Sequence, residues 1–230
     1  MPSLAQVARE SQDAWNAYIL QTRPLWQEKR HPALQSRQIV FGVMPKRMAE
    51  VLTETLKGAP KEKLNARAVE PWAVTGAYKQ DEVDELNDKN DFCVLSESVR
   101  VVLGIVLEYL MEPVAQVLGC PWRVLNVRAW ETLAVADGGP AKWHTDGGPG
   151  GMLKITLYPN GGGLIVDAGA DKKSEITGKG IWALFYNSML HHSAVTFPGR
   201  VVAEITLVPA AEFDLAPHSC GQNGKYPILP

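Results

Sequence analysis

Cysteine is scarce in this sequence: its 230 residues include only three, Cys93, Cys120 and Cys220. Their odd number and wide separation exclude a disulfide framework and a zinc site built from paired cysteines, and they favour a reducing compartment, the cytoplasm. The sequence also lacks an excess of charge of one sign, since its formal net charge is -2. This near balance argues against a surface that binds nucleic acid or an anionic membrane.

A long uninterrupted apolar run is missing as well. The most apolar stretch, residues 99–118, is interrupted by charged residues and a proline, which predicts a buried helix instead of a membrane span. The composition is that of a globular protein, with 46% hydrophobic and 21% charged residues. The length is sufficient for one structural domain with a full hydrophobic core.

The first part of the chain, residues 1–121, has mainly helical patterns and is expected to support the rest. An amphipathic stripe predicts a helix over residues 4–22. A strand is expected at 38–45, followed by a helix over residues 46–57. Residues 59–92 are rich in polar and charged side chains, and we expect them to hold little regular structure.

The apolar helix of this first part has its own start and stop signals. Ser96 or Ser98 is suited to cap its N-terminus. Pro113 is expected to begin a second helical segment, because proline is tolerated in a first turn and disrupts a helix interior. Gly119 then ends the segment.

From residue 122 onward, short strand-like runs alternate with glycine-rich turns. The runs lie at residues 123–135, 152–159, 163–169, 181–187 and 200–209. This spacing predicts a β-barrel or sandwich. Helices followed by strands indicate an α+β protein in which the N-terminal helices pack on one sheet. Residues 122–210 therefore form the expected core, and residues 211–230 form an irregular tail.

Histidine and aspartate stand two residues apart in the glycine-rich stretch WHTDGGPGG, at His144 and Asp146, and two further histidines follow in NSMLHH. Two imidazoles and one carboxylate on one face of a metal form the facial triad that suits non-haem Fe(II) and leaves coordination positions open. Nine residues after His191 comes Arg200, whose guanidinium suits two parallel hydrogen bonds to a carboxylate. The pattern predicts a metal site beside an anion site.

Strand periodicity gives the runs at 152–159 and 200–209 one apolar and one partly polar face. The polar faces carry Lys154, Thr156 and Tyr158 on the first run and Arg200, Val202, Glu204 and Thr206 on the second. We expect the apolar faces to contact the helices and the polar faces to line the interior. Lys154 and Glu204 are expected to pair there.

The second part of the chain resembles the Fe(II)/2-oxoglutarate-dependent dioxygenases, nearest in style to the prolyl-hydroxylase-like and phytanoyl-type branches. The matching segments are His144-Thr145-Asp146, Tyr158-Pro159-Asn160 with Gly162-Gly163-Leu164, Leu190-His191-His192-Ser193, and Gly199-Arg200. The resemblance covers about residues 122–209 and implies a double-stranded β-helix, a cupin-like jelly-roll barrel. It further implies that His144, Asp146 and His191 ligate iron, while Arg200 binds the distal carboxylate of 2-oxoglutarate with Tyr158 beside it.

The doubled histidine leaves two alternatives for the distal ligand, because adjacent strand residues point to opposite faces and only one of the two can ligate. We choose His191, since many relatives have His-x-Ser after the ligand and a similar spacing to the arginine; His192 is the alternative. No Arg-x-Ser follows, because Arg200 is succeeded by two valines, and this disfavours the plant-type subgroup.

Several residues near these motifs are candidates for a substrate pocket. They are Arg128, Trp130, Trp143, Met152, Lys154 and Glu204. For the aromatic residues the alternative is a place in the core, and for Lys154 and Glu204 it is a structural ion pair. Residues 59–92 and the GGPGG loop at 147–151 could form a lid over the site.

The resemblance therefore implies an enzyme that uses Fe(II), 2-oxoglutarate and O2 to oxidise an unactivated C–H bond, with release of succinate and CO2. Hydroxylation of a small molecule, an amino acid or a peptide is the expected reaction, and no nucleic-acid or membrane partner is expected. One alternative is a non-haem Fe(II) oxygenase that does not use 2-oxoglutarate. Another is a cupin-like protein that binds a metal or a ligand without oxygenase activity.

Overall fold

The computed structural model describes residues 39–64, 80–118, 122–133, 143–145, 153–167, 173–186 and 189–209. Several predicted features lie outside these ranges: the helix at 4–22, the tail at 211–230, the loop at 147–151, Asp146 and Met152.

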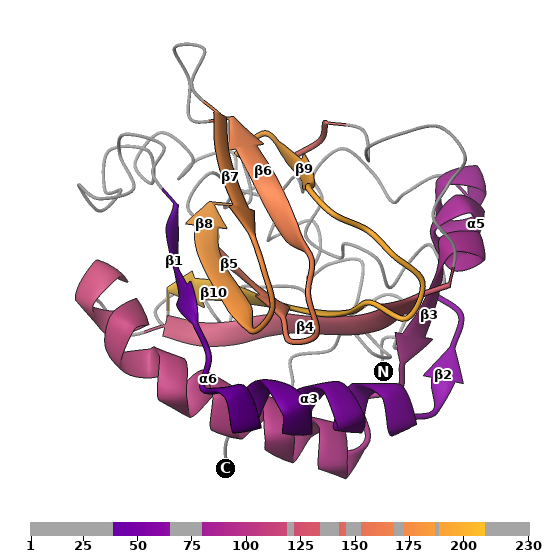
Figure 1. Cartoon of the computed structure of the whole chain (residues 1–230), viewed down its shortest axis with the longest axis horizontal. Coiled ribbons are helices and arrows are strands. Elements are labelled where there is room, and N and C mark those ends of the chain that lie inside the picture. The colour runs from indigo at the N-terminus through magenta and orange to yellow at the C-terminus, as the bar shows by residue number, and fades with distance from the viewer. Residues whose placement is uncertain are drawn as a thin grey trace, which may run out of the picture.

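Helices precede most of the strands, as expected for an α+β protein (Figure 1). The described helices are α3 (Lys46–Gly58), α5 (Gln80–Lys89) and α6 (Glu97–Leu118). The strands of the first part are β1 (Val40–Val43), β2 (Lys61–Glu62) and β3 (Asn90–Cys93). The strands of the second part are β4 (Trp122–Thr132), β5 (Leu153–Tyr158), β6 (Gly163–Asp167), β7 (Lys173–Thr177), β8 (Ile181–Tyr186), β9 (His191–Ser193) and β10 (Val201–Pro209).

The strands form two antiparallel sheets. The seven-stranded sheet has the order β1-β8-β5-β10-β4-β3-β2, and the three-stranded sheet has the order β7-β6-β9. Figure 1 shows the small sheet lying over one face of the large sheet, while α3 and α6 run along the other face. Among the described residues no strand pairing joins the two sheets, so the expected closed barrel is replaced by two facing sheets.

The large sheet has an apolar outer face toward the helices and a partly polar inner face toward the small sheet. Register places Leu157 beside Ala203 and Ile155 beside Ile205 on the outer face, where all four side chains are fully buried. These residues belong to the same hydrophobic core as Leu52 of α3 and other buried residues of α3 and α6. On the inner face Lys154, Thr156 and Glu204 occupy neighbouring positions. The predicted division between the two faces is therefore confirmed.

Residues 59–92 contain more regular structure than their composition suggested, and that expectation was wrong. β2 pairs with β3, and β3 pairs with β4, so this stretch extends the large sheet. The polar residues belong in part to α5, a largely exposed helix with a Glu85–Lys89 ion pair one turn apart. Polar composition here reflects solvent exposure of a helix and not the absence of one.

Pro113 does not begin a new segment, because α6 continues through it as one helix of 22 residues. A proline in a helix interior leaves the carbonyl group four residues earlier without its N–H partner. That carbonyl belongs to Tyr109, whose side chain is 45% exposed, so solvent is close to this side of the helix. Leu103, Val106 and Leu110 on the opposite side are buried and anchor the turns of the helix that precede the proline. No helix in the described ranges has the length and apolar character needed to cross a membrane.

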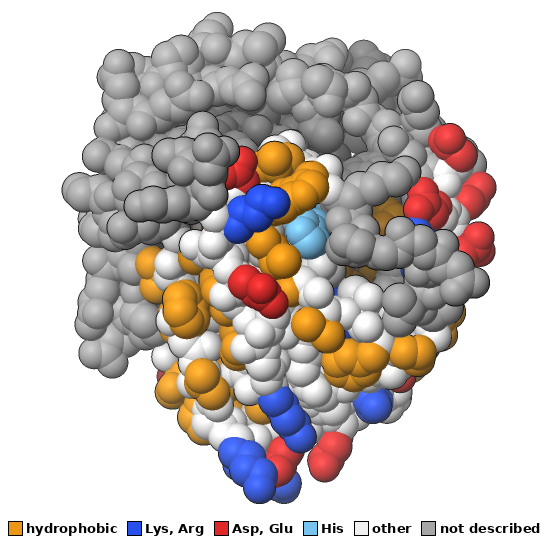
Figure 2. Space-filling view, turned by 45° about the horizontal axis from the view of Figure 1, so that its top comes forward, with side chains coloured by type: hydrophobic (Ala, Val, Ile, Leu, Met, Phe, Trp, Pro, Cys, Tyr) orange, Lys and Arg blue, Asp and Glu red, His pale blue; other side chains and the backbone are white. Residues whose placement is uncertain are grey.

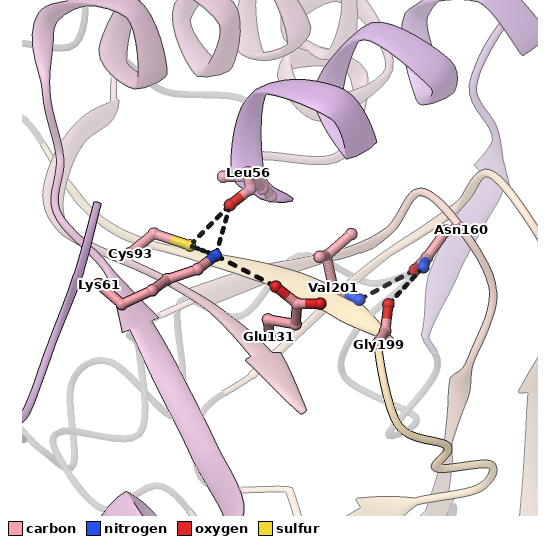
Figure 3. Close-up of polar contacts among 7 residues, drawn as sticks. All are labelled: Leu56, Lys61, Cys93, Glu131, Asn160, Gly199 and Val201. Carbon is pink, nitrogen blue, oxygen red and sulfur yellow. Dashed lines mark hydrogen bonds and ion pairs between the residues drawn. The ribbon is translucent and has the colours of Figure 1, made fainter. Parts of the chain in front are cut away.

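A polar clamp on the outer face joins α3, β2, β3 and β4 (Figure 3). Lys61 donates a hydrogen bond to the Leu56 carbonyl at 2.7 Å and forms an ion pair with Glu131 at 3.3 Å. The Cys93 thiol donates to the same carbonyl at 3.3 Å. Burial raises the pKa of Cys93, with nearby Lys61 acting in the opposite direction, so the thiol stays protonated. The clamp satisfies the carbonyl group at the end of α3 and ties that end to the sheet.

Replacing Lys61 by methionine tests this clamp, because methionine retains the apolar stem but removes the charge. We expect Lys61→Met to lower the free energy of unfolding by about 1–2 kcal/mol, since Glu131 and the Leu56 carbonyl lose a partner. Urea denaturation measures the change. The exposed residue Lys179 provides the control, and Lys179→Met should change stability by less than about 0.5 kcal/mol. Equal denaturation midpoints for both variants would show that the clamp contributes nothing.

Candidate functional site

His144 and His191 lie side by side because their backbones pair across the edge of the small sheet. They form an isolated antiparallel bridge with two backbone hydrogen bonds of 3.0 and 2.9 Å. On its other side His191 pairs with Val166 of β6. The two imidazole ring centroids are 4.5 Å apart. Residues separated by 47 positions are thus held with their rings in contact by strand register.

The imidazole of His191 has a defined tautomer when it is neutral. Its Nδ1 atom lies 2.8 Å from the carbonyl oxygen of Met189. A carbonyl oxygen only accepts hydrogen bonds, so Nδ1 carries the proton and Nε2 carries the lone pair. An imidazole oriented through Nδ1 in this way is the usual arrangement for a histidine that ligates a metal through Nε2.

His192 faces the opposite side of the small sheet. Its ring packs edge-on against Trp143, with centroids 4.3 Å apart, and the ammonium group of Lys173 lies 5.3 Å from the Trp143 ring. The structure therefore places the predicted pocket residue Trp143 beside His192, whereas His191 contacts Phe185 of the large sheet at 4.9 Å. His144 is exposed and His191 is 6% exposed, so the His144–His191 pair spans the border between solvent and interior. Figure 2 shows a histidine side chain next to hydrophobic side chains on the face that it draws.

The described residues bring together two of the three predicted ligands. Asp146 stands two positions after His144 but lies outside the described ranges, as does the pocket candidate Met152. Within those ranges no group of three histidine, cysteine or acidic side chains gathers closely enough to hold a metal. Two adjacent imidazoles are present, and one of them has its Nδ1 fixed by a carbonyl group. These donors fit a divalent transition metal.

Arg200 is buried in the interior between the sheets, with Tyr158 close by. Its guanidinium donates to the Val195 carbonyl at 2.9 Å and to the Thr132 hydroxyl at 3.4 Å. Arg200 is 4% exposed and Tyr158 is also 4% exposed. Burial lowers the pKa of Arg200, while Tyr158 and Glu204 act in the opposite direction. No carboxylate in the described parts of the chain forms an ion pair with Arg200, so a buried cation is held there by neutral acceptors.

Gly162 allows Arg200 and Tyr158 to approach each other. A Cβ atom at this position would lie 2.9 Å from the Tyr158 ring and 3.0 Å from Arg200 Cδ. Its φ of 129° is also a conformation that other residues rarely adopt. Any larger residue would therefore displace both side chains.

Asn160 holds the backbone on both sides of Arg200 (Figure 3). Its side-chain amide donates to the Gly199 carbonyl at 2.8 Å, and its amide oxygen accepts from the Val201 backbone N–H at 2.9 Å. Asn160 and Gly162 belong to the segments that carry the family resemblance, but no role was predicted for either residue. The only available signal was an Asn-Gly-Gly turn 40 residues before Arg200.

The predicted Lys154–Glu204 pair is confirmed, and Arg128 joins it. Glu204 Oε2 lies 3.1 Å from Lys154 Nζ and 2.8 Å from a guanidinium nitrogen of Arg128. Lys154 is fully buried, which is tolerable for an ammonium group because the carboxylate lies beside it. Trp130 lies against Phe92, with ring centroids 5.9 Å apart, and packs on buried apolar residues. Its described contacts are thus those of a core residue.

The tautomer of His191 is open to direct test by nitrogen-15 NMR. In the neutral ring we expect the proton on Nδ1, because the Met189 carbonyl must receive it. Long-range proton–nitrogen correlation spectra of metal-free protein distinguish the two tautomers. A dominant Nε2-protonated ring would contradict the hydrogen bond to Met189.

Comparison with known proteins supports a relationship at the level of fold. No protein-family model and no curated protein sequence matches the chain. Among solved structures, a 2OG-Fe(II) oxygenase family oxidoreductase from Burkholderia pseudomallei matches with a TM-score of 0.52 at 9% identity, covering 80% of this chain and 89% of that one. A Trichoplax adhaerens prolyl hydroxylase in complex with a hypoxia-inducible-factor peptide fragment matches with a TM-score of 0.54 at 13% identity, covering 86% and 96%.

A third similar structure is EctD from S. alaskensis with bound Fe, with a TM-score of 0.50 at 15% identity and coverage of 75% of this chain and 73% of that one. All three are members of the 2-oxoglutarate-dependent Fe(II) oxygenases. The resemblance inferred from the sequence motifs is therefore confirmed for the fold, and at these identities the comparison extends no further than the fold.

Proposed function

We propose that this protein is an Fe(II)/2-oxoglutarate-dependent oxygenase built on a double-stranded β-helix. The proposal rests on two features of the interior between the sheets. Two imidazoles are paired at its edge, and Arg200 is buried deeper inside, with no ion-pair partner in the described ranges. His144, His191 and Asp146 would hold the metal, and Arg200 with Tyr158 would hold the distal carboxylate of 2-oxoglutarate. When bound, the metal and 2-oxoglutarate together would supply the chemistry by which O2 oxidises an unactivated C–H bond.

The chain's own residues position and shield the reactants. The Met189 carbonyl orients His191, and Asn160 and Gly162 set the position of Arg200. The interior around Arg200 is nearly closed to solvent, and this strengthens its attraction for a carboxylate. Phe185 contacts the His191 ring, and Leu164 and Val166 lie on β6 beside β9. Each is at most 1% exposed, so they exclude water from the space beside His191. In this proposal none of these residues transfers a proton.

The proposed substrate is a small molecule, an amino acid or a peptide, and hydroxylation is the proposed reaction. The Trichoplax prolyl hydroxylase was solved in complex with a peptide fragment, which supports keeping peptides among the candidate substrates. Arg128, Lys154 and Glu204 give the proposed pocket a charged wall. Release of succinate, screened against small molecules, amino acids and peptides, identifies the substrate class.

Loss of Arg200 tests the cosubstrate assignment. In anaerobic titrations, wild-type protein with Fe(II) and 2-oxoglutarate together should show a weak visible absorption that neither ligand produces alone. We expect Arg200→Ala to weaken 2-oxoglutarate binding roughly 100-fold, because two charge-assisted hydrogen bonds are lost. The exposed Arg47→Ala is the control and should bind as wild type does. Unchanged affinity in Arg200→Ala would favour an Fe(II) oxygenase that uses no 2-oxoglutarate.

Separate substitutions of the adjacent histidines test the metal assignment. We expect His191→Ala to lower Fe(II) affinity at least about 10-fold, since one side chain that would bind the metal directly is lost. His192→Ala should retain Fe(II) within about threefold, because its ring packs on Trp143 on the other side of the small sheet. Anaerobic calorimetry measures both. A larger loss in His192→Ala would exchange the two roles, and wild-type protein that binds no Fe(II) would favour a cupin-like protein without oxygenase activity.

A further inference from the structure

The short segment that carries His144 is attached to the small sheet through one isolated bridge. The backbones of His144 and His191 exchange two hydrogen bonds of 3.0 and 2.9 Å, whereas β5 and β8 share a register over their full lengths. A single bridge can open while the rest of a sheet stays closed, because few contacts must break at the same time. Opening would carry the His144 ring away from the His191 ring. The distance between the two imidazoles therefore depends on what holds this segment in place.

An aromatic contact lies on the outer side of the same bridge. In the antiparallel register the residue before His144 faces the residue after His191. These two residues are Trp143 and His192, and their side chains lie on the face away from the interior, since adjacent strand residues point to opposite faces. The ring centroids are 4.3 Å apart and the rings meet edge to face at 81°. Such a pair contributes about as much as one backbone hydrogen bond.

Both rings of this outer pair have further contacts that fix them. The Nδ1 atom of His192 lies 2.8 Å from the carbonyl oxygen of Ser193, and His192 is only 6% exposed although it faces outward. The ammonium group of Lys173 on β7 lies 5.3 Å from the centre of the Trp143 ring, within the range of a cation–π attraction. In the small sheet β6 separates β7 from β9. Trp143 therefore reaches across the outer face of the sheet and contacts residues of both outer strands.

We propose that Trp143 and His192 are a positioning pair, which holds the segment of His144 against β9 and keeps the two imidazoles of the inner pair together before any metal is bound. This inference rests on the proposed function, in which His144 and His191 bind Fe(II). A metal bound by both histidines requires the closed bridge, so its apparent affinity is proportional to the fraction of molecules in which the bridge is closed. The two adjacent histidines thus have different roles, because His191 binds the metal and His192 anchors the segment that carries the other imidazole.

Amide hydrogen exchange in the metal-free full chain measures how often the bridge opens. The backbone N–H groups of His144 and His191 are the probes, since each donates one of the two bridge hydrogen bonds. We expect Trp143→Ala to accelerate their exchange roughly 3- to 10-fold, because the outer pair is lost. Trp143→Phe keeps an aromatic ring and should stay within about twofold of wild type. Amides of β5 should exchange as in wild type in every variant.

Two further variants show whether the two rings act together. In the Trp143→Ala background, adding His192→Ala should change the exchange by less than about twofold, because the contact between the rings is already absent. Tyr109→Ala is the control, since Tyr109 is an aromatic residue of α6 with 45% exposure, against 37% for Trp143. Its loss should leave the exchange of both bridge amides unchanged.

Anaerobic calorimetry with Fe(II) tests the consequence for the metal. Trp143→Ala should weaken Fe(II) binding at least about twofold, and by no more than the factor by which exchange is accelerated. His192→Phe keeps a ring but has no nitrogen donor, and it should bind Fe(II) within about twofold of wild type. Accelerated exchange with unchanged Fe(II) affinity in Trp143→Ala would overturn the positioning role. A large loss of Fe(II) in His192→Phe would overturn it as well, because His192 would then be a ligand.

The outcomes separate this inference from the proposed function. Unchanged exchange in Trp143→Ala, or a full additional acceleration when His192→Ala is added, would show that the pair does not hold the bridge, and the oxygenase assignment would stand. Wild-type protein that binds no Fe(II) would overturn the proposed function and with it the role in metal binding, while accelerated exchange in Trp143→Ala would still show that the pair holds the bridge.

Discussion

Alternation of side chains along β5 and β10 is the constraint on which the other features of the interior depend. These neighbouring strands lie in the middle of the large sheet, so both of their faces are buried. The outer face meets α3 and α6 and must be apolar. Every polar residue on these strands is consequently directed inward, where water cannot solvate it, and must find a partner within the protein or a ligand.

The charged inner residues meet this requirement in different ways. Lys154 and Arg128 share one carboxylate, that of Glu204, and form a network within the protein. Arg200 instead donates to a carbonyl and a hydroxyl, which engage two of its nitrogens without neutralising its charge. A buried cation of this kind attracts an anion more strongly than an exposed one does, since little solvent screening opposes it. The contrast between the two arrangements is the physical basis for assigning the anion site to Arg200.

Sequence patterns predicted features whose signal is local, and they missed features that depend on distant contacts. The strand at 40–43, the helix beginning at 46 and the alternating faces of β5 and β10 follow from hydrophobic periodicity. β2 and β3 were missed because their short, polar sequences gain strand structure only by pairing with each other and with β4. Pro113 was misread because burial of the α6 residues before it outweighs one lost hydrogen bond.

The residues of the candidate site also fall into two groups, those that local sequence signals predicted and those whose roles depend on distant contacts. Histidine and arginine are chemically conspicuous, so His144, His191 and Arg200 could be proposed from their spacing together with the family resemblance. Asn160 acts through two backbone groups 39 and 41 residues away, and Gly162 acts through the absence of a side chain. Such roles can be recognised only in the three-dimensional structure.

Register also decides which of two adjacent histidines faces His144. Pairing of His191 with Val166 on one side and with His144 on the other directs its ring toward Phe185 and the interior. A shift of β9 by one residue would exchange the two rings and place His192 in that position. Such a shift would break the pairing of His191 with Val166 and with His144 and would remove the contact of its ring with Phe185. The orientation of His191 is therefore a property of the packed sheets, and the pair of histidine letters in the sequence does not contain it.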